Sequence, residues 1–434
     1  MAKPGLQRRI EAGEAVVCVI GQGYVGLTVA AAAAGAGMQV RAVDISADRV
    51  AALAAGRNVV PGVDDELFAL GHGSGRMSFG SDFAAVGESD VVLLCVPTPV
   101  VDHRPDLSYI ESAARGVAPY LSRGSLVVLE STTYPGTTEQ VVMPLLEAHG
   151  LRSGTDFLLA YSPERVDPGN PKYGLRNTPR VVGGLDPAAT ATAAAFYALL
   201  VDDVHTVSSC RAAELAKLLE NTFRMVNIAL VNELAVLCAD QGIDVWEVID
   251  AAGTKPFGFM PFYPGPGVGG HCIPLDPTYL AWQARRDTGR RLHLVETAQD
   301  INAQMPAYVA GRVVDTLNDH GLSVRGARLL ALGVTYKRDV GDVRESAAIE
   351  VLERLQRKGA EVSFHDPFVE EVHEQGLSLA RSDLTVEALA AADCVLLLTP
   401  HSSYDLDLIV RHSALLFDAR NAIGDRHTPS VVTL

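Results

Sequence analysis

The segment that most restricts the fold lies near the start of the chain, where the motif GQGYVG occupies residues 21–26. It follows the uncharged, strand-like run AVVCVI and precedes the helical pattern LTVAAAAAGAGM. Glycines at the first, third and sixth positions of the motif permit a tight turn and a close approach of two backbones. A second strand-like run, QVRAVDIS (39–46), comes next. This order of strand, glycine turn, helix and strand predicts a doubly wound α/β domain.

The same segment predicts a dinucleotide site. Gly21, Gly23 and Gly26 would let a pyrophosphate approach the positive end of the following helix. Asp44 ends the second strand. A carboxylate there accepts hydrogen bonds from the ribose of NAD and repels the extra phosphate of NADP. The alternative is a structural glycine turn without a ligand. Because a strand and a helix flank the motif as nucleotide binding requires, we expect NAD as the cofactor.

The length of 434 residues indicates two or three domains. We expect an α/β NAD-binding domain at 1–205, a helical domain at 206–318 and a smaller α/β domain at 319–434. Residues 212–242 are apolar almost all round, with no Gly or Pro before Gly242. They predict a long, deeply buried helix, either between domains or at a dimer contact. The expected fold class is α/β, with two Rossmann-like doubly wound domains joined by a central helical domain.

Composition argues against several kinds of partner. The formal net charge of −16 disfavours nucleic acid, because a phosphate-binding surface needs an excess of basic residues. The six cysteines are scattered without metal-ligand spacing, so we expect no disulfide framework, no metal site and a reducing, cytoplasmic location. Residues 15–40 carry no charge, but glycines divide them into a strand, a turn and a helix. We therefore expect no membrane segment.

A loop rich in glycine and proline, GPGVGGHCIPLDP (265–277), contains a single cysteine. Such a composition argues against a helix or a central strand. Because Cys272 has loop residues around it, unlike the cysteines in apolar runs, it is a candidate nucleophile. Asp276 would either act on a nearby water or cap a turn. His271 adjoins the cysteine, and we interpret it as structural.

Three polar residues of the predicted long helix, Lys217, Asn221 and Arg224, share one face because their spacing is i, i+4 and i+7. They would form either a solvated stripe or a group that stabilises an oxyanion in a cleft. A second polar group follows a predicted strand and consists of Lys337, Arg338 and Arg344 in TYKRDVGDVRES (335–346). It would form either an exposed charged loop or a site for phosphate or carboxylate, to which Arg420 in FDARN could contribute.

Eight motifs occur in one order along the chain: GQGYVGL, CVPTP, ESTTYPGTTE, YSPERVDPGN, AELAKLLENTFR, GPGVGGHCIPLDP, YKRDVGDVRES and FDARN. Over nearly its whole length the chain resembles the nucleotide-sugar 6-dehydrogenases of the UDP-glucose/GDP-mannose dehydrogenase family. The segments TKPFGFMPFYPGPGVGGHCIPLDP and SPERVDPGN make the likeness greatest to the family's UDP-N-acetylglucosamine enzymes. UDP-glucose enzymes usually show Phe-Leu-Arg after the Pro-Glu pair, whereas this chain has Arg165-Val166-Asp167.

The resemblance implies that the C6 alcohol of a UDP-sugar is oxidised to a carboxylic acid, with two NAD and one water. Cys272 would capture the intermediate aldehyde as a thiohemiacetal and then carry the acyl group as a thioester. Lys217 and Asn221 match the pair that holds the C6 oxygen. Asp276 matches an acid that acts through water. Thr132 matches the family's motif threonine near that water. Glu164 matches the glutamate implicated in hydrolysis of the thioester.

The resemblance also implies the binding contacts. Together with the glycine turn, the expected cofactor contacts are Gly21, Gly23, Tyr24, Val25, Gly26, Asp44, Arg49, Thr98, Thr132 and Arg344. The expected contacts to the UDP-sugar are Glu164, Arg165, Lys217, Asn221, Arg224, Tyr263, Gly265, Gly267, Gly269, Lys337 and Arg420. A homodimer or larger homo-oligomer and a role in polysaccharide precursor synthesis are further implications.

Three alternatives remain at this point. The same chemistry on UDP-ManNAc, UDP-GalNAc or UDP-glucose differs by only a few pocket contacts. A 3-hydroxyacid-type dehydrogenase shares the α/β and long-helix layout, but it oxidises once and needs neither a thiol nor a second nucleotide-like domain. A catalytically inactive binder of NAD or a nucleotide sugar would not need Lys217, Asn221, Cys272 and Asp276 together.

Overall fold

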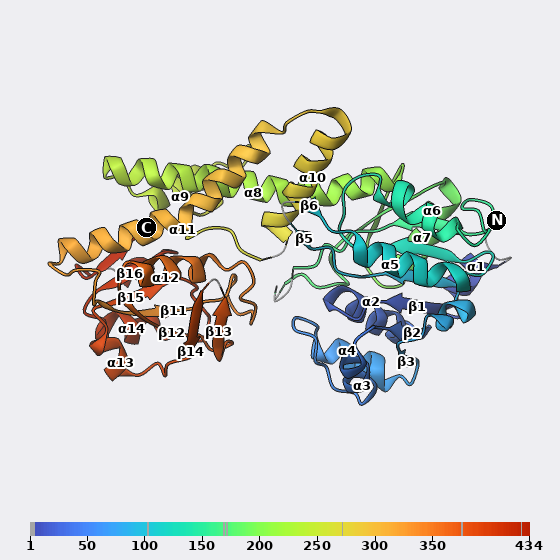
Figure 1. Cartoon of the computed structure of the whole chain (residues 1–434), viewed down its shortest axis with the longest axis horizontal. Coiled ribbons are helices and arrows are strands. Elements are labelled where there is room, and N and C mark those ends of the chain that lie inside the picture. Colours follow the sequence, from blue (N-terminus) through green and yellow to red (C-terminus); the bar gives the residue numbers. More distant parts are fainter. Residues whose placement is uncertain are drawn as a thin grey trace. The chain divides into compact units, whose positions relative to one another are not determined.

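The computed structural model describes residues 5–101, 104–167, 170, 172–270, 272–374, 376–426 and 428–434, and for residues 272 and 425 the backbone alone (Figure 1). His271 lies outside the described residues. The chain divides into two compact units. Unit 1 comprises Met1–Glu220 and Thr278–Asp287, and unit 2 comprises Asn221–Pro277 and Thr288–Leu434. The boundary falls within the two helices α8 (Cys210–Gln241) and α10 (Cys272–Thr288).

Unit 1 is built on an eight-stranded sheet of order β10-β9-β8-β7-β4-β1-β2-β3. All strand pairs are parallel except β8 with β9, which is antiparallel. The strands are β1 (Val16–Ile20), β2 (Gln39–Val43), β3 (Met77–Gly80), β4 (Val91–Leu94), β7 (Leu126–Leu129), β8 (Leu158–Tyr161), β9 (Arg180–Gly184) and β10 (Val204–Val207). The central strands are buried runs of Val and Leu, as parallel strands covered on both faces require.

Helices cover both faces of this sheet. Alternate residues of β1 enter different cores, with Val17 and Val19 in one and Cys18 and Ile20 in the other. The helices of unit 1, besides its parts of α8 and α10, are α1 (Leu6–Glu11), α2 (Tyr24–Gly35), α3 (Ala47–Ala54), α4 (Asp65–Gly73), α5 (Ser108–Val117), α6 (Met143–Glu147) and α7 (Pro187–Tyr197). A short hairpin, β5 (Val100–Val101) and β6 (Arg104–Pro105), follows β4. The predicted doubly wound α/β fold is confirmed.

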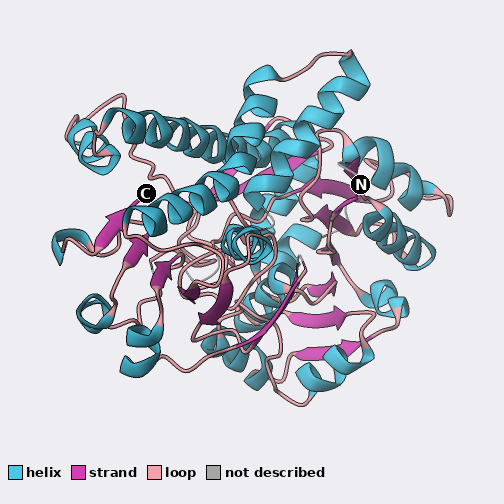
Figure 2. Ribbon diagram, turned by 60° about the vertical axis from the view of Figure 1, so that its left-hand side comes forward, coloured by secondary structure: helices cyan, strands magenta, loops and turns pink. Residues whose placement is uncertain are grey.

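Unit 2 contains a five-stranded parallel sheet of order β12-β11-β15-β16-β17. Its strands are β11 (Arg328–Leu332), β12 (Glu361–His365), β15 (Cys394–Leu397), β16 (Leu416–Asp418) and β17 (Val431–Thr433), beside a hairpin of β13 (Glu371–Glu374) and β14 (Leu377–Ala380). Its other helices are α9 (Val245–Gly253), α11 (His293–Asp319), α12 (Ala347–Arg357), α13 (Val386–Ala391) and α14 (Leu406–His412). Figure 2 distinguishes the strands of each unit from the helices around them.

The predicted long helix is present as α8, and one of its faces is exposed in the single chain. Leu219, Leu230 and Leu237 are 62%, 52% and 49% exposed. Within the part of the chain that the structure describes, α8 is the one helix long and apolar enough to cross a membrane. Length and composition are weak evidence for that, because core helices of water-soluble proteins pass the same test.

The prediction that residues 265–277 avoid helix is correct for 265–270 and wrong from Cys272, where α10 begins. Pro274 falls in the first turn of α10, where the missing N–H has no helical partner to lose. Pro277 lies just beyond it, inside the helix. The prolines therefore mark the start of a helix, and the glycines before them mark the loop.

The glycines of that loop allow it to touch a second loop of unit 2. A Cβ on Gly269 would lie 2.6 Å from the carbonyl oxygen of Glu345, and one on Gly270 would lie 2.7 Å from the Tyr336 ring. The Gly270 N–H also donates to the Arg344 carbonyl oxygen at 3.3 Å. The backbone of the 265–270 loop thus packs directly on residues 335–346, a motif about 70 residues further along the chain.

We predict opposite effects of two Gly→Ala substitutions in unit 2. Gly269→Ala should lower the free energy of unfolding by about 1–3 kcal/mol, because the added methyl overlaps the Glu345 carbonyl. Gly311→Ala in α11 meets no atom within 4 Å and should raise it by about 0.4–1 kcal/mol. Thermal and denaturant unfolding of both variants measure this. Equal effects would show that the loop adapts freely.

Candidate active site

The glycine turn of unit 1 leaves no room for a side chain at its first and last glycines, Gly21 and Gly26. Gly21 has a φ of 93°, in the left-handed region that favours glycine. A Cβ on Gly21 would lie 2.5 Å from the Cys95 carbonyl oxygen, and a Cβ on Gly26 would overlap the Gly21 carbonyl. Gly23 caps α2, whose first turn contains no acidic residue. The N–H groups that begin α2 therefore form a positive end fit for a pyrophosphate.

Asp44 lies just after β2 and holds the glycine turn. It is 4% exposed, and its Oδ2 accepts a hydrogen bond from the Gln22 N–H at 2.7 Å. Its Oδ1 accepts from the Ser46 N–H at 2.8 Å, and the Arg49 guanidinium lies 3.0 Å away. The turn, the helix end and the carboxylate meet at one edge of the sheet. This arrangement fits the NAD that the sequence predicts.

The other expected cofactor contacts divide between the units. Tyr24 and Val25 form the start of α2. Thr98 follows β4, and its carbonyl oxygen accepts a hydrogen bond from the Tyr279 hydroxyl. Arg344 belongs to unit 2, where its guanidinium lies 2.6 Å from Asp342.

The loop that contains Thr132 is fixed by a glutamate of α8 that the sequence reasoning missed. Thr132 is half-buried after β7. Glu214 is fully buried and accepts hydrogen bonds from the N–H groups of Gly136 and Thr138, at 2.5 and 2.9 Å, and from the Thr138 hydroxyl. Burial raises the pKa of Glu214. The sequence feature that could have indicated Glu214 is an acidic residue within the apolar helical pattern AAELAK.

Glu164 follows β8 and is 8% exposed. Its Oε2 lies 2.5 Å from an Arg180 nitrogen, and its Oε1 accepts hydrogen bonds from the N–H groups of Arg165 and Val166 at 2.6 Å each. Burial alone would raise the pKa of Glu164, but the Arg180 charge and the donated N–H groups outweigh it and lower the pKa. Glu164 is therefore an ionised, fixed carboxylate, and Arg180 is a second residue that sequence reasoning missed.

The polar residues of α8 differ in environment along the helix. Lys217 is half-buried, Asn221 is 4% exposed, and Arg224 is exposed. Near Lys217 in the sequence, Glu220 forms an ion pair with Arg165 at 2.7 Å. The three predicted residues thus do not form one uniformly solvated stripe.

In unit 2 the structure brings together two residues that the sequence singled out separately. The Asn221 amide nitrogen donates to the Asp276 carboxylate at 2.5 Å, and both side chains are 4% exposed. Asp276 lies one helical turn after Cys272 on α10. Asp276 of α10 and Asn221 of α8 therefore form a buried acid–amide pair one helical turn from the start of α10.

Two asparagines and an aromatic pair fix the segment before the glycine loop. Asn232 accepts a hydrogen bond from the Gly265 N–H at 3.1 Å and donates to Asn302 at 2.9 Å. The Tyr263 hydroxyl donates to Asp250 at 2.8 Å, and its ring stacks on Trp246. Both asparagines were missed, although an amide in an apolar helix signals a buried partner.

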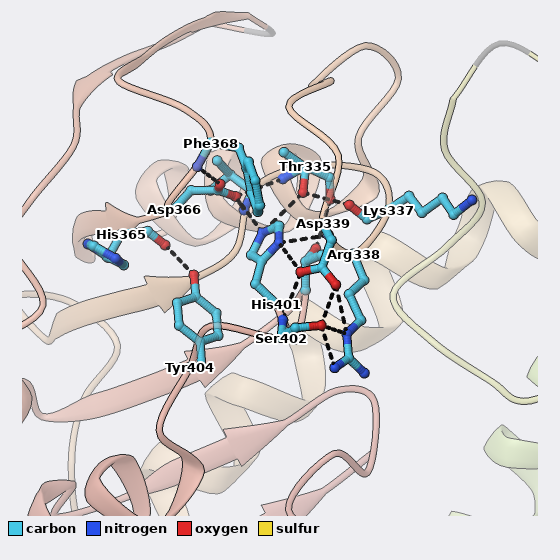
Figure 3. A network of polar contacts seen from close by, with 12 residues as sticks. Thr335, Lys337, Arg338, Asp339, His365, Asp366, Phe368, His401, Ser402 and Tyr404 are labelled. Atoms are coloured by element: carbon cyan, nitrogen blue, oxygen red, sulfur yellow. Dashed lines mark hydrogen bonds and ion pairs between the residues drawn. The ribbon is translucent and has the colours of Figure 1, made fainter. Parts of the chain in front are cut away.

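A polar cluster at the carboxyl edge of the unit 2 sheet fixes the loop that contains Lys337 (Figure 3). His401, 3% exposed, accepts the Asp339 N–H at Nδ1 at 3.0 Å, so Nε2 carries the hydrogen and donates to Asp366 at 2.9 Å. Asp366 also accepts from the backbone N–H groups of Val334, Thr335 and Phe368. Burial would raise the pKa of Asp366, but the His401 and backbone hydrogen bonds lower it. The Lys337 side chain extends away from the cluster.

Arg420 lies after β16 at the same edge. Burial lowers its pKa to about 10, against the opposing effect of Asp418, so the guanidinium stays charged at neutral pH. A Cβ on Gly265 would overlap this guanidinium, which places Arg420 against the glycine loop. The next residue, Asn421, has a φ of 50°. Unit 2 therefore brings a cation, the glycine loop and the Lys337 loop to one region, as recognition of an anionic ligand requires.

Comparison with known proteins covers both units. Models of the UDP-glucose/GDP-mannose dehydrogenase family match in three parts: the NAD-binding domain at residues 15–201, the central domain at 211–304 and the UDP-binding domain at 330–425. A 3-hydroxyacid-type dehydrogenase would not need a UDP-binding domain, so the match at 330–425 argues against that alternative.

Similar proteins agree with these matches. A Pyrococcus horikoshii protein named UDP-N-acetyl-D-mannosamine dehydrogenase is 35% identical over 420 residues, 94% of this chain and 96% of that protein. A Pseudomonas aeruginosa protein named UDP-N-acetyl-D-glucosamine 6-dehydrogenase is 35% identical over 394 residues, 89% and 91% of the two chains. The solved structure of the P. horikoshii UDP-D-ManNAc dehydrogenase has a TM-score of 0.86 at 33% identity, with 96% and 98% coverage. The chain belongs to the UDP-glucose/GDP-mannose dehydrogenase family, whose members are NAD-dependent nucleotide-sugar dehydrogenases.

Proposed function

We propose that the protein oxidises the C6 alcohol of a UDP-N-acetylhexosamine to the uronic acid in two oxidation steps. The first candidate substrate is UDP-GlcNAc. The observation that supports this most is the buried contact of Asn221 with Asp276, one turn from Cys272. A thiol, an acid and an amide donor on two packed helices suit a reaction that traps an aldehyde. UDP-ManNAc is the second candidate substrate, because several relatives are named for it.

The residues of this chain have distinct roles in the proposal. Lys217 and Asn221 bind the C6 oxygen and stabilise its negative charge. Each of two NAD molecules would accept one hydride when bound, the first from the alcohol and the second from the thiohemiacetal. The Cys272 sulfur bonds to the aldehyde carbon and prevents its release. This step uses the thiolate form of the cysteine, which is the nucleophile.

Binding of the UDP part is assigned to unit 2. Lys337 and Arg420 would bind the diphosphate as charged donors, and the backbone of the glycine loop would contact the sugar. Gly265, Gly267 and Gly269 suit this role because side chains there would overlap neighbouring atoms. We infer that NAD is held in unit 1 by the glycine turn and Asp44.

We also propose a homodimer formed through α8. Phe223, Leu230, Leu234 and Leu237 recur at helical spacing and are 46%, 52%, 36% and 49% exposed. An apolar stripe of this kind favours a partner of the same chemistry, and a second copy supplies one. The mass of the protein in solution tests this.

Replacing the proposed nucleophile should abolish acid formation. Cys272→Ala is expected to reduce uronic acid production by about 10³-fold or more, with binding of the UDP-sugar largely retained. Product chromatography measures the acid, and calorimetry measures binding. Cys238→Ala is the matched control, because Cys238 is a buried cysteine of α8 that packs among residues of α8 and α9. Normal acid production by Cys272→Ala would refute the covalent mechanism.

The carboxylate of Asp44 should set the cofactor preference. The wild-type protein is expected to prefer NAD, and Asp44→Ala should lower kcat/KM for NAD by about tenfold or more, since a charged acceptor is lost. Asp48→Ala, at an exposed position in the first turn of α3, is the control. Steady-state kinetics with NAD and NADP measure both values. Equal kcat/KM for the two cofactors in the wild type would contradict the assigned role.

A further inference from the structure

The loops that follow two neighbouring strands of unit 2, β11 and β15, are joined around one buried histidine. His401 is 3% exposed and lies in the loop after β15. The loop after β11 contains Lys337, and its segment 335–339 is bonded to the imidazole (Figure 3). The rings of Phe368 and Tyr404 pack on the imidazole, with centroid distances of 5.1 and 5.4 Å. The imidazole is therefore enclosed at the base of the loop that presents Lys337.

The hydrogen-bond partners of His401 define its tautomer. The Asp339 backbone N–H can only donate, so Nδ1, 3.0 Å away, accepts and carries no hydrogen. The Thr335 hydroxyl donates to the Lys337 carbonyl oxygen at 2.9 Å, so toward Nε2, at 3.3 Å, it can only accept. Both contacts, and the bond from Nε2 to Asp366, require the hydrogen on Nε2. His401 is thus a neutral imidazole that offers an acceptor to one end of the 335–339 segment and a donor to the other.

The first end of this segment is also held without His401. The Thr335 N–H donates to Asp366 at 3.3 Å, and the Thr335 carbonyl oxygen accepts from the Thr399 hydroxyl at 2.7 Å. Asp366 in turn keeps three backbone donors besides the imidazole. Loss of the Nε2 donor alone would therefore leave this end of the segment in place.

The second end of the segment depends more on the imidazole. Asp339 has a φ of 60°, in the left-handed region that is unfavourable for most residues with a side chain. Its carboxylate accepts from the Ser402 N–H at 2.7 Å, and its own backbone N–H donates to Nδ1 of His401. The Nδ1 acceptor therefore holds the backbone of Asp339 in an unfavourable conformation, two residues after Lys337.

We propose that His401 is a positioning residue for the UDP-sugar, whose Nδ1 holds the Asp339 backbone and thereby keeps Lys337 in place to bind the diphosphate. This inference rests on the proposed function, which assigns the diphosphate to Lys337 and Arg420. The Lys337 side chain extends away from the imidazole, so His401 acts through the backbone of the loop (Figure 3). A loop that is held before the ligand arrives avoids the entropy cost of ordering it on binding.

The test measures the affinity of the full-length protein for UDP alone by titration calorimetry, with two variants that separate the ring nitrogens. His401→Asn puts an amide oxygen near the position of Nδ1 and keeps the acceptor for Asp339. His401→Gln puts an amide nitrogen near the position of Nε2 and keeps only the donor to Asp366. His401→Gln should weaken UDP binding by about tenfold, whereas His401→Asn should stay within about threefold of the wild type.

A double-mutant cycle shows whether His401 acts through Lys337. Lys337→Ala alone should weaken UDP binding by about tenfold or more, because a charged donor is lost. Adding His401→Gln to that variant should cause less than about a twofold further loss, since the loop no longer presents a cation to position. A purely structural role for His401 would instead give the same loss in both backgrounds.

Steady-state kinetics give a second measurement, with whichever UDP-sugar the wild type oxidises. His401→Gln should raise the KM for the sugar by about tenfold and leave kcat and the KM for NAD nearly unchanged, because only ligand binding is weakened. His373→Gln is the matched control, since His373 is 65% exposed in the β13–β14 hairpin of the same unit, where it pairs with Glu371. It should keep the wild-type UDP affinity and kinetics.

Two results would overturn the inference: wild-type UDP affinity in a folded His401→Gln protein, or an equal loss with and without Lys337. If His401→Gln fails to fold, two other measurements decide. A hydrogen on Nδ1 in the imidazole nitrogen NMR spectrum of the wild type, or weak UDP binding by His401→Asn, refutes the inference, and the opposite pair of results supports it. If the wild-type protein itself does not bind UDP, the proposed function is wrong in its assignment of unit 2, and the inference fails with it.

Discussion

Parallel strand pairing is the constraint on which the site of each unit depends. Because parallel strands end at the same edge, residues far apart in the sequence meet there. In unit 1 the strand register aligns Ile20 of β1 with Val43 and Leu94, so the glycine turn, Asp44 and Cys95 follow at one level. The residues that follow the strands of unit 2 in the same way are Thr335, Asp366, His401 and Arg420.

Close backbone contact is the second recurring principle. In unit 1 a glycine turn touches the end of β4, and in unit 2 the 265–270 loop touches residues 335–346. Neither contact tolerates a Cβ, so both positions were visible in the sequence as glycine patterns. Their partners were not visible, because only the folded chain shows which backbone approaches. In unit 2, the 265–270 loop and the loop that contains Lys337 therefore form one structural feature, although they are separate motifs in the sequence.

Sequence reasoning recovered the fold class and the long helix, because strand, turn and helix patterns are local. It placed Asn221 and Asp276 among the candidates without predicting their contact. It failed where charge is buried: Arg180, Glu130 and Glu214 look like ordinary surface residues until the strands and helices around them are packed. It also misread the start of α10, since proline disfavours a helix interior but is tolerated in its first turn. The exposed face of α8 could not be predicted from an all-apolar pattern.

The protein has a negative net charge and binds anionic ligands through local groups of positive charge. The chain has a net charge of −16, yet NAD and a UDP-sugar are anions. The α2 N-terminus offers positive charge in unit 1, and Arg420, charged at neutral pH with a pKa of about 10, offers it in unit 2. Isolated cations in partly buried places attract an anion more strongly than exposed ones, because water screens them less.

The central claim is that one thiol allows two oxidations of one sugar. The most direct measurement is the number of NADH released per sugar consumed, with UDP-GlcNAc, UDP-ManNAc, UDP-GalNAc and UDP-glucose offered separately. The account predicts two NADH and the uronic acid from UDP-GlcNAc, and little from the others. Two NADH from a different sugar would keep the mechanism and change the substrate. One NADH with free aldehyde would contradict the account, because Cys272 would then not trap the intermediate.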